Sequence, residues 1–188
     1  MRKLKLQVQL SIDGFASGPN EEKDWVFIPG PDPAGFQKLI DLADSSDTLL
    51  MGRKAAQSGF IQHWQKEADN PIDNPQKTMG QLITNMRKVV FSNTETTISG
   101  KNVEVETGDL ATVVQALKNQ PGKDILVYGG GELVFSLITQ NLIEEYYILT
   151  CPVALGSGLP IFKERKILKL ESSTAFNNGK VLNKYLPV

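Results

Sequence analysis

Apolar and polar residues alternate along the first twelve positions of the chain. Every second position from Leu4 to Ile12 is apolar, and polar residues lie between. A period of two is typical of a β-strand with one buried face. Asp13-Gly14 ends this predicted strand, and residues 17–35 form a long loop rich in glycine and proline. We interpret the loop as functional rather than as a linker, because it carries large apolar side chains.

The middle of the chain predicts helices and buried strands in alternation. Helical spacing of apolar residues recurs in residues 36–43, 110–117 and 132–140, and Asp109 is the expected N-cap of the second helix. Short apolar runs, typical of strands buried on both faces, occupy residues 48–51, 88–92 and 125–128. Val103 and Val105 indicate another short strand, whereas the polar, proline-broken residues 62–80 indicate a surface excursion.

The last third of the chain has a different pattern. Strands are expected at residues 146–150, 161–170 and 181–186, with glycine-containing turns at residues 156–158 and 177–179. Strand–helix alternation followed by an antiparallel end predicts one three-layer α/β domain over residues 1–188. Its central sheet is expected to be mixed and mostly parallel.

Composition narrows the classes of function. The chain has 188 residues, with 20 Lys+Arg against 21 Asp+Glu, so it has no electrostatic footprint for nucleic acid. One cysteine, Cys151, and one histidine, His63, exclude an internal disulfide and a Cys/His zinc cluster. No apolar run is long enough to span a bilayer, and the N-terminus does not resemble a signal peptide. We therefore expect a cytoplasmic protein that acts on a small molecule.

The strongest local signal is the glycine run between a buried strand and a helix. Gly129, Gly130 and Gly131 would let the backbone approach a ligand, and the following helix would direct N–H groups at an anion. These glycines could cradle a diphosphate. A tight turn needed only for packing is an equal alternative.

Two other predicted strands also end in residues suited to binding phosphate or sugar. Gly52, Arg53 and Lys54 follow one strand, and Ser92 and Asn93 end another. Taken alone, Arg53 and Lys54 indicate only the start of an ordinary helix that carries basic residues. Because ligands of open α/β sheets bind beyond the carboxyl ends of strands, three such ends together favour a nucleotide site.

Several segments together resemble the dihydrofolate-reductase-like fold. They are S-I-D-G-F, M-G-R-K, V-F-S-N-T, Y-G-G-G-E-L-V and L-G-S-G-L-P-I-F, and the resemblance covers about residues 3–186. It is strongest to the bacterial branch similar to the C-terminal reductase domain of riboflavin-biosynthesis enzymes. The resemblance implies an eight-stranded, mostly parallel sheet and bound NADPH.

The resemblance also implies where the cofactor lies. The diphosphate would meet the glycine run with Glu132 and Leu133, the adenosine phosphates would meet Gly52, Arg53 and Lys54, and the adenine ribose would meet Ser92 and Asn93. Two residues depart from the pattern: Ala55 stands where the family often has threonine, and Asn93 where it often has arginine. Both changes weaken phosphate binding, so the choice between NADPH and NADH stays open.

Four residues are candidates on the substrate side. Asp32 lies four residues before Phe36. Dihydrofolate reductases likewise carry an acidic residue four positions before a phenylalanine, at the start of their first helix. In an apolar cleft the pKa of Asp32 would be raised and it could protonate a heterocycle. Alternatively it is the solvated N-cap of a helix. Asp13 is expected to orient the loop or to contact the substrate, and the alternative is that it only forms a turn with Gly14. Trp25 and Phe27 are expected to line the cleft, and the alternative is that they belong to the core.

The residues and the resemblance together predict an NAD(P)H-dependent oxidoreductase. Hydride would pass to a C=N or C=O bond of a small pterin-, aminopyrimidine- or ribose-type substrate, as in 5-amino-6-(5-phosphoribosylamino)uracil reductase. The alternative is a non-catalytic nucleotide- or ligand-binding module that retains the fold. The wide apolar run from Tyr146 to Leu149, together with the pairing of related domains, predicts a homodimer built from the C-terminal region. A monomer with a central strand there is the alternative.

Overall fold

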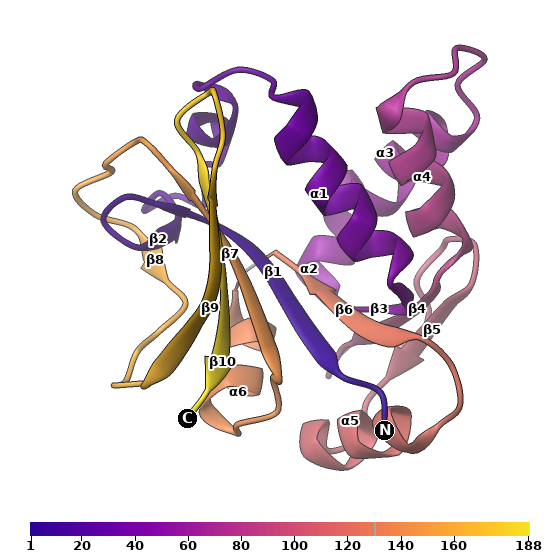
Figure 1. Ribbon diagram of the computed structural model, residues 1–188. Coiled ribbons are helices and arrows are strands. Elements are labelled where there is room, and N and C mark those ends of the chain that lie inside the picture. Colours follow the sequence, from indigo (N-terminus) through magenta and orange to yellow (C-terminus); the bar gives the residue numbers. More distant parts are fainter. Residues whose placement is uncertain (130) are drawn as a thin grey trace. The chain divides into compact units, whose positions relative to one another are not determined.

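A computed structural model describes residues 1–129 and 131–188 (Figure 1). The chain forms two compact units. The first unit consists of residues 1–3 and 36–127, and the second of residues 4–35 and 128–188. Each unit has its own strands and helices, and each is described in turn.

The first unit is built on parallel strands in the order β5-β4-β3-β6. Their bounds are β3 (Ser46–Gly52), β4 (Arg87–Phe91), β5 (Val103–Glu106) and β6 (Asp124–Tyr128), whose last residue belongs to the second unit. Leu49, Leu50 and Met51 of β3 are all buried. Successive side chains point to opposite faces, so β3 is covered on both sides, as its continuous apolar run predicts.

The helices of the first unit include a pair that the sequence pattern concealed. They are α1 (Pro33–Asp44, which begins in the second unit), α2 (Arg53–Ala55), η2 (Ala56–Phe60), α3 (Ile61–Ala68), α4 (Pro75–Asn85) and α5 (Leu110–Asn119). Asp109 caps α5 as predicted, since its side chain accepts a hydrogen bond from the Thr112 amide at 2.9 Å. The expectation of a surface excursion over residues 62–80 is wrong, because α3 and most of α4 lie there.

Pro75 begins α4 rather than breaking a helix. It occupies the first turn, where proline loses no intrahelical hydrogen bond. The side chain of Asn74 accepts a hydrogen bond from the Lys77 amide at 2.8 Å and so caps the helix. Met79, Gly80 and Ile83 form the buried face.

The second unit has strands in the order β1-β7-β10-β9. The bounds are β1 (Leu4–Ser11), β7 (Glu145–Cys151), β9 (Leu168–Ala175) and β10 (Val181–Pro187). β1 and β7 run parallel, whereas β10 is antiparallel to both β7 and β9. The unit also contains a small two-stranded sheet, β2 (Phe15–Ser17) with β8 (Leu159–Pro160), the 3₁₀ turn η1 (Asp24–Phe27) and the helix α6 (Glu132–Thr139).

These strands confirm the predicted fold class, with one local correction. The chain is mixed α/β with mostly parallel strand pairs and an antiparallel C-terminal end. The expected strand over residues 161–170 is wrong in most of its length, since β9 begins only at Leu168. The apolar run in β7 belongs to a central strand between β1 and β10, as the monomer alternative requires.

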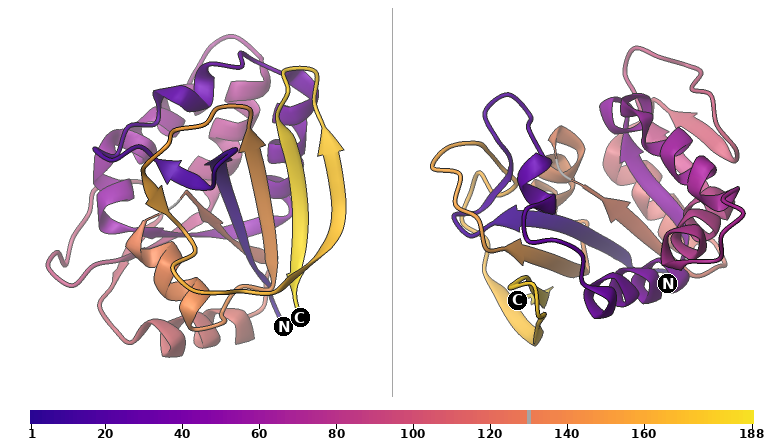
Figure 2. Two further views of the ribbon diagram at one scale, coloured as in Figure 1. Left: turned by 90° about the vertical axis from the view of Figure 1, so that its left-hand side faces the viewer. Right: turned by 90° about the horizontal axis from the view of Figure 1, so that it is seen from above.

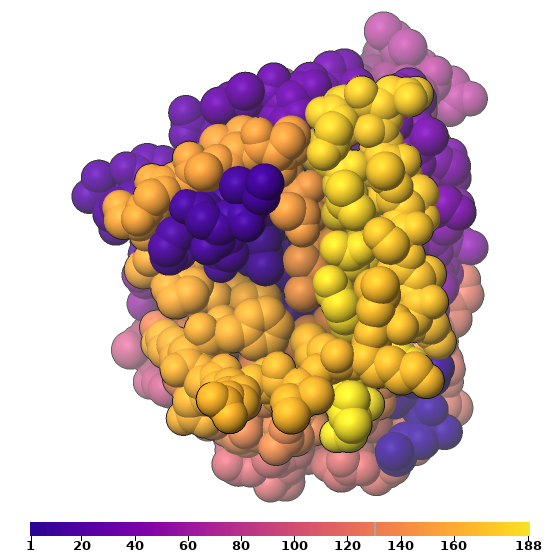
Figure 3. Space-filling model, turned by 60° about the vertical axis from the view of Figure 1, so that its left-hand side comes forward, coloured from indigo at the N-terminus to yellow at the C-terminus, as the bar shows by residue number. Residues whose placement is uncertain are grey.

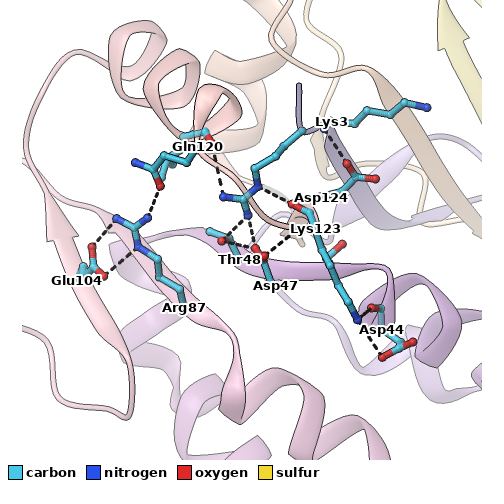
Figure 4. Close-up of polar contacts among 12 residues, drawn as sticks. Lys3, Asp44, Asp47, Thr48, Arg87, Glu104, Gln120, Lys123 and Asp124 are labelled. Atoms are coloured by element: carbon cyan, nitrogen blue, oxygen red, sulfur yellow. Dashed lines mark hydrogen bonds and ion pairs between the residues drawn. The ribbon is translucent and has the colours of Figure 1, made fainter.

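A buried arginine joins three segments of the first unit (Figure 4). Arg2 is only 6% exposed and forms an ion pair with Asp47. Its guanidinium also donates to Thr48 Oγ1 at 2.6 Å and to the carbonyl oxygen of Lys123. The Lys123 amide donates in turn to Asp47 Oδ2 at 2.7 Å. The N-terminus is thereby tied to the beginning of β3 and to the residues just before β6.

We predict that Gly80→Ala lowers the free energy of unfolding by up to about 2 kcal/mol, because overpacking costs about 1–3 kcal/mol and helix propensity offsets roughly 1 kcal/mol of it. A Cβ at position 80 would lie 2.5 Å from the Ala68 nitrogen and 2.8 Å from the Trp64 oxygen, so α3 would have to move away. This cost outweighs the gain in helix propensity of roughly 1 kcal/mol. Urea unfolding measures the change, and Gln81→Ala at the exposed neighbouring position is the control. Equal stability of Gly80→Ala and wild type would contradict the packing argument.

Candidate functional site

In the first unit, two of the predicted strand ends lie at one edge. β3 and β4 are parallel neighbours, and Gly52 at the end of β3 is in register with Phe91 at the end of β4. Gly52-Arg53-Lys54 and Ser92-Asn93 therefore leave neighbouring strands on the same side. The structure brings these two predicted groups together, as the carboxyl ends of parallel strands require.

The two cations stand at the start of a helix. Arg53 begins α2, is half-buried, and donates from Nη1 to Gln57 Oε1 at 2.9 Å. Lys54 is exposed. The bond to Gln57 orients the guanidinium, whose planar set of donors suits bidentate contact with a phosphate.

Ser92 shapes the turn that follows β4. The residue is buried, and its hydroxyl oxygen accepts hydrogen bonds from the Glu95 amide at 2.8 Å and the Thr94 amide at 3.3 Å. A serine that binds the backbone two and three residues ahead stabilises a local turn. Ser92 thus orders the loop on which Asn93 is exposed.

In the second unit, the described glycines of the glycine run adopt backbone conformations that favour glycine. Gly129 has a φ of +102° and Gly131 a φ of +97°, and among residues 1–129 and 131–188 no heavy atom beyond each glycine and its chain neighbours lies within 4 Å of where a Cβ would stand at either. Gly129 donates its amide hydrogen to the Gln7 carbonyl oxygen at 3.0 Å. The open space beside both glycines is room for a ligand at the backbone. Gly130 lies outside the described residues.

The N-terminus of α6 carries a charge pair. Glu132 is exposed in the first turn and lies 3.5 Å from Lys163 Nζ, while Leu133 is half-buried. The ammonium of Lys163 also lies 4.0 Å from the centre of the Phe135 ring. A carboxylate in the first turn suits the helix dipole, and Lys163 offsets its charge. No pattern in the sequence pointed to Lys163.

Asp32 is the N-cap of α1. Its Oδ1 accepts a hydrogen bond from the Gly35 amide at 2.9 Å, and its Oδ2 accepts from the Asn178 amide at 3.4 Å. The hydrogen bond from Gly35 is the largest cause that lowers the pKa of Asp32 below its usual value. The expectation of a raised pKa is therefore wrong, because backbone N–H groups stabilise the carboxylate. The helix-cap alternative is confirmed.

Asp13 orients the loop that contains L-G-S-G. Its carboxylate accepts hydrogen bonds from Ser11 Oγ at 2.6 Å, the Gly156 amide at 2.7 Å and the Leu155 amide at 3.0 Å. These bonds, with that from Ser11 the largest cause, lower the pKa of Asp13 to about 2. The residue thus holds two backbone N–H groups that lie more than 140 positions away in the chain.

The two aromatic candidates take different positions. Trp25 is 3% exposed, packs with Val26 and Cys151, and donates from Nε1 to the Glu22 carbonyl oxygen at 3.1 Å. It therefore has the core position that the sequence left as an alternative. Phe27 is 78% exposed. A substrate contact of Phe27 stays a prediction.

The hairpin turn between β9 and β10 holds the loop that precedes α1 (Figure 2). Asn178 Nδ2 donates to the Gly30 carbonyl oxygen at 3.0 Å, and Lys180 Nζ donates to the Val26 carbonyl oxygen at 2.8 Å. Lys180 Nζ also lies 3.5 Å from Gln9 Oε1. Sequence reasoning missed all three of these side chains, because the Asn-Asn-Gly segment indicated only a turn.

Residues 1–129 and 131–188 lack two further kinds of feature. In this part of the chain no group of three or more His, Cys, Asp or Glu side chains could hold a metal ion. None of the helices found there has the length and apolar character needed to cross a membrane.

Comparison with known proteins places the chain in a family. Residues 2–182 match the model of the RibD C-terminal domain. The chain belongs to the RibD C-terminal domain family. The match spans both compact units and confirms the resemblance seen in the motifs.

Relatives of this RibD C-terminal domain protein include curated and solved examples. The chain is 34% identical over 183 residues to the uncharacterized protein YyaP of Bacillus subtilis, covering 96% of this chain and 92% of YyaP. It resembles Acinetobacter baumannii RibD with a TM-score of 0.74 at 18% identity, covering 100% of this chain and 58% of that one.

A third relative is the diaminohydroxyphosphoribosylaminopyrimidine deaminase/5-amino-6-(5-phosphoribosylamino)uracil reductase of Thermotoga maritima. The TM-score is 0.68 at 15% identity, over 100% of this chain and 57% of that one. Such low identities establish the shared fold. The chain spans a little over half the length of these two solved proteins.

We predict that Asp13 makes stability depend on pH in the acid range. The folded-state pKa of about 2 lies below the usual value of 3.8, so the unfolded chain binds more protons in this range. The stabilisation is present above pH 3.8 and is lost as the pH falls towards about 2. Urea unfolding over this range should show a shallower loss of stability for Asp13→Asn than for wild type.

Amide exchange at neutral pH provides a second readout for Asp13. The amides of Leu155 and Gly156 should exchange faster in Asp13→Asn, because one neutral carboxamide oxygen replaces the two charged carboxylate oxygens that accept from them and from Ser11. Asp73→Asn, in the exposed connection between α3 and α4, is the control. Identical acid profiles and exchange rates in Asp13→Asn and wild type would refute the role of Asp13.

Proposed function

We propose that this protein is an NADPH-dependent reductase of a small heterocyclic substrate. The observation that carries the proposal is the shared edge of β3 and β4, where Arg53 and Ser92 leave adjacent parallel strands in a chain of the RibD C-terminal domain family. Cationic and hydroxyl side chains at neighbouring carboxyl ends suit the phosphate and ribose of a nucleotide.

The glycine run supports the same cofactor. Both Gly129 and Gly131 have positive φ angles and open space where a side chain would stand, so a diphosphate could approach the backbone closely. Gly131 is the N-cap of α6, and the helix dipole there favours an anion. Glu132 stays compatible with this anion because Lys163 lies 3.5 Å from its carboxylate.

The residues of this chain would bind the cofactor and the substrate, orient them, and exclude water from the site. Bound NADPH would supply a hydride to the carbon of a C=N or C=O bond, and the nitrogen or oxygen of that bond would take a proton. Asp13 holds the loop at Leu155 and Gly156, and Asn178 and Lys180 hold the segment that presents Phe27. Asp32 is assigned the positioning of α1 and not proton transfer, since its pKa is lowered.

The names of two structural neighbours support a class of substrate for this proposal. The Thermotoga maritima protein is named as a reductase of 5-amino-6-(5-phosphoribosylamino)uracil, and another structural neighbour, from Corynebacterium diphtheriae, is named as pyrimidine reductase-like. We therefore propose an aminopyrimidine, pterin or ribosylated relative as the substrate of this chain.

Two measurements test the proposed function. Fluorescence titration with NADPH should show saturable binding, and absorbance at the nicotinamide band should fall when a matching member of an aminopyrimidine, ribosylaminouracil and pterin panel is added. Binding without turnover on any member would favour the non-catalytic module, which Ala55 and Asn93 favour slightly. Failure to bind either NADPH or NADH would overturn the proposed reductase.

Cofactor choice can be tested at Arg53 and Lys54. If these side chains contact the adenosine 2′-phosphate, changing both to alanine should weaken NADPH much more than NADH. Each lost charge-assisted hydrogen bond costs about 1.5–3 kcal/mol, roughly a 10- to 100-fold loss of affinity. Lys66→Ala, in the last turn of α3, is the control. An equal loss for both cofactors would place the two cations away from the 2′-phosphate.

A second copy of the chain remains the proposed partner, with its interface at β9. This strand ends the strand order of the second unit, and seven of its eight residues are exposed. The surface over the two C-terminal strands is the yellow face in Figure 3. Leu170 is 51% exposed and the adjoining Ile167 is 68% exposed. An uncovered edge strand invites pairing. Antiparallel pairing centred on Leu170 would set Lys169 of one copy against Glu171 of the other.

Sedimentation at micromolar concentration tests this dimer. We expect a species of about twice the chain mass of 20.7 kDa, and Leu170→Pro should convert it to monomer because proline removes a ladder donor. Circular dichroism checks that the variant is folded. A single wild-type species near 20.7 kDa would end the proposal.

A further inference from the structure

Gln9 lies at the meeting point of several elements of the second unit. It is half-buried near the end of β1. Its Oε1 lies 3.5 Å from Lys180 Nζ and 3.8 Å from Cys151 Sγ, so this oxygen accepts from the residue just before β10 and from the last residue of β7. A carboxamide can accept at its oxygen and donate at its nitrogen at the same time.

The Gln9 side chain also hydrogen-bonds the phenol of Tyr128. Burial raises the pKa of Tyr128, and the hydrogen bond with Gln9 opposes that rise. A bond that favours the phenolate is one that donates to the phenol oxygen. Because Oε1 is occupied by Lys180 and Cys151, the Gln9 nitrogen is the atom suited to this donation.

Each of these partners governs a different loop. Lys180 Nζ donates at 2.8 Å to the carbonyl oxygen of Val26, inside the turn η1 whose next residue is the exposed Phe27. Tyr128 is the residue directly before Gly129, where the glycine run begins. One amide group therefore touches the anchors of both the proposed substrate loop and the proposed cofactor turn.

We propose that Gln9 is a positioning residue that sets the η1 turn and the glycine run together. Its oxygen fixes Lys180 and through it η1, and its nitrogen fixes Tyr128 and through it Gly129. The functional meaning of the two loops rests on the proposed reductase activity. The effect of Gln9 on the order of the two loops can be measured in the free protein, without a ligand.

The strand supplies a matched control. Gln7 lies two residues earlier on the same face of β1, is buried, and its Nε2 has no partner among residues 1–129 and 131–188. Removing its side-chain amide should leave both loops in place. The Gln7 carbonyl that accepts from Gly129 is backbone and is kept in the variant.

Three variants separate the two contacts of the Gln9 amide. The η1 arm is the contact of its oxygen with Lys180, and the glycine arm is the contact of its nitrogen with Tyr128. Gln9→Leu removes both hydrogen bonds. Gln9→Glu keeps an acceptor for Lys180 and removes the donor to Tyr128. Lys180→Met removes the η1 arm and leaves Tyr128 its donor.

Amide hydrogen exchange of the ligand-free protein measures how each contact of Gln9 affects the opening of its loop. The amides of Val26, Ile28 and Gly30 are hydrogen-bonded within and just after η1, and that of Gly129 is bonded to Gln7, so their exchange reports opening of each loop. Gln9→Leu should accelerate exchange about 3- to 10-fold in both loops. Gln9→Glu should do so only at Gly129, and Lys180→Met only in η1. Unchanged exchange in Gln9→Leu, or equal acceleration in Gln7→Leu, would overturn the proposal.

NADPH affinity links this mechanical role to function. We expect the dissociation constant to rise about 3- to 10-fold in Gln9→Leu and in Gln9→Glu, but not in Gln7→Leu. If wild type binds no NADPH, the proposed function fails, and the exchange pattern still decides the role of Gln9. If wild type binds but the Gln9 variants bind equally well, the cofactor turn does not depend on Gln9 and the proposal fails.

Discussion

The first unit depends on the buried guanidinium of Arg2. The guanidinium of Arg2 supplies hydrogen bonds to Thr48 and to the carbonyl oxygen of Lys123, and it pairs with Asp47. Removing a buried charged donor leaves its acceptors without a partner, which costs more than the pair itself contributes. Because β3 and β6 pair in parallel, a clamp at their beginning also determines where they end. The position of Arg53 is thus set at the opposite end of β3 from Asp47.

The second unit uses a different means to hold its loops. Carboxylates of Asp13 and Asp32 accept from backbone N–H groups, while Asn178 and Lys180 donate to backbone carbonyl oxygens. Most of these contacts are polar and join residues far apart in the sequence, so the loops keep a defined shape without burying all their apolar side chains. This is why Phe27 can remain exposed on an ordered turn, available to a ligand.

Sequence pattern predicted the strands better than the short helices or the side-chain roles. Apolar runs such as residues 48–51 have few alternatives to a buried strand, and the carboxyl ends of parallel strands necessarily share an edge. The α3–α4 pair was missed because Pro75 was interpreted as a breaker, although proline also begins helices. The helix-cap role of Asp32 was within reach of the sequence because Gly35 lies three residues away, whereas the bond from Asn178 joins residues 146 positions apart and lies beyond any local pattern.

The β9–β10 turn carries a consequence for engineering of the chain. By sequence, Asn177-Asn178-Gly179 is the kind of exposed turn in which a tag or an inserted domain is usually tolerated. In the folded protein Asn178 is bonded to the segment before α1, and Gly179 would bring a Cβ within 3.3 Å of Pro152. The connection between α3 and α4, where Ile72 is 67% exposed, is the more permissive place for a graft. An insertion at the hairpin would instead detach the loop that this turn holds.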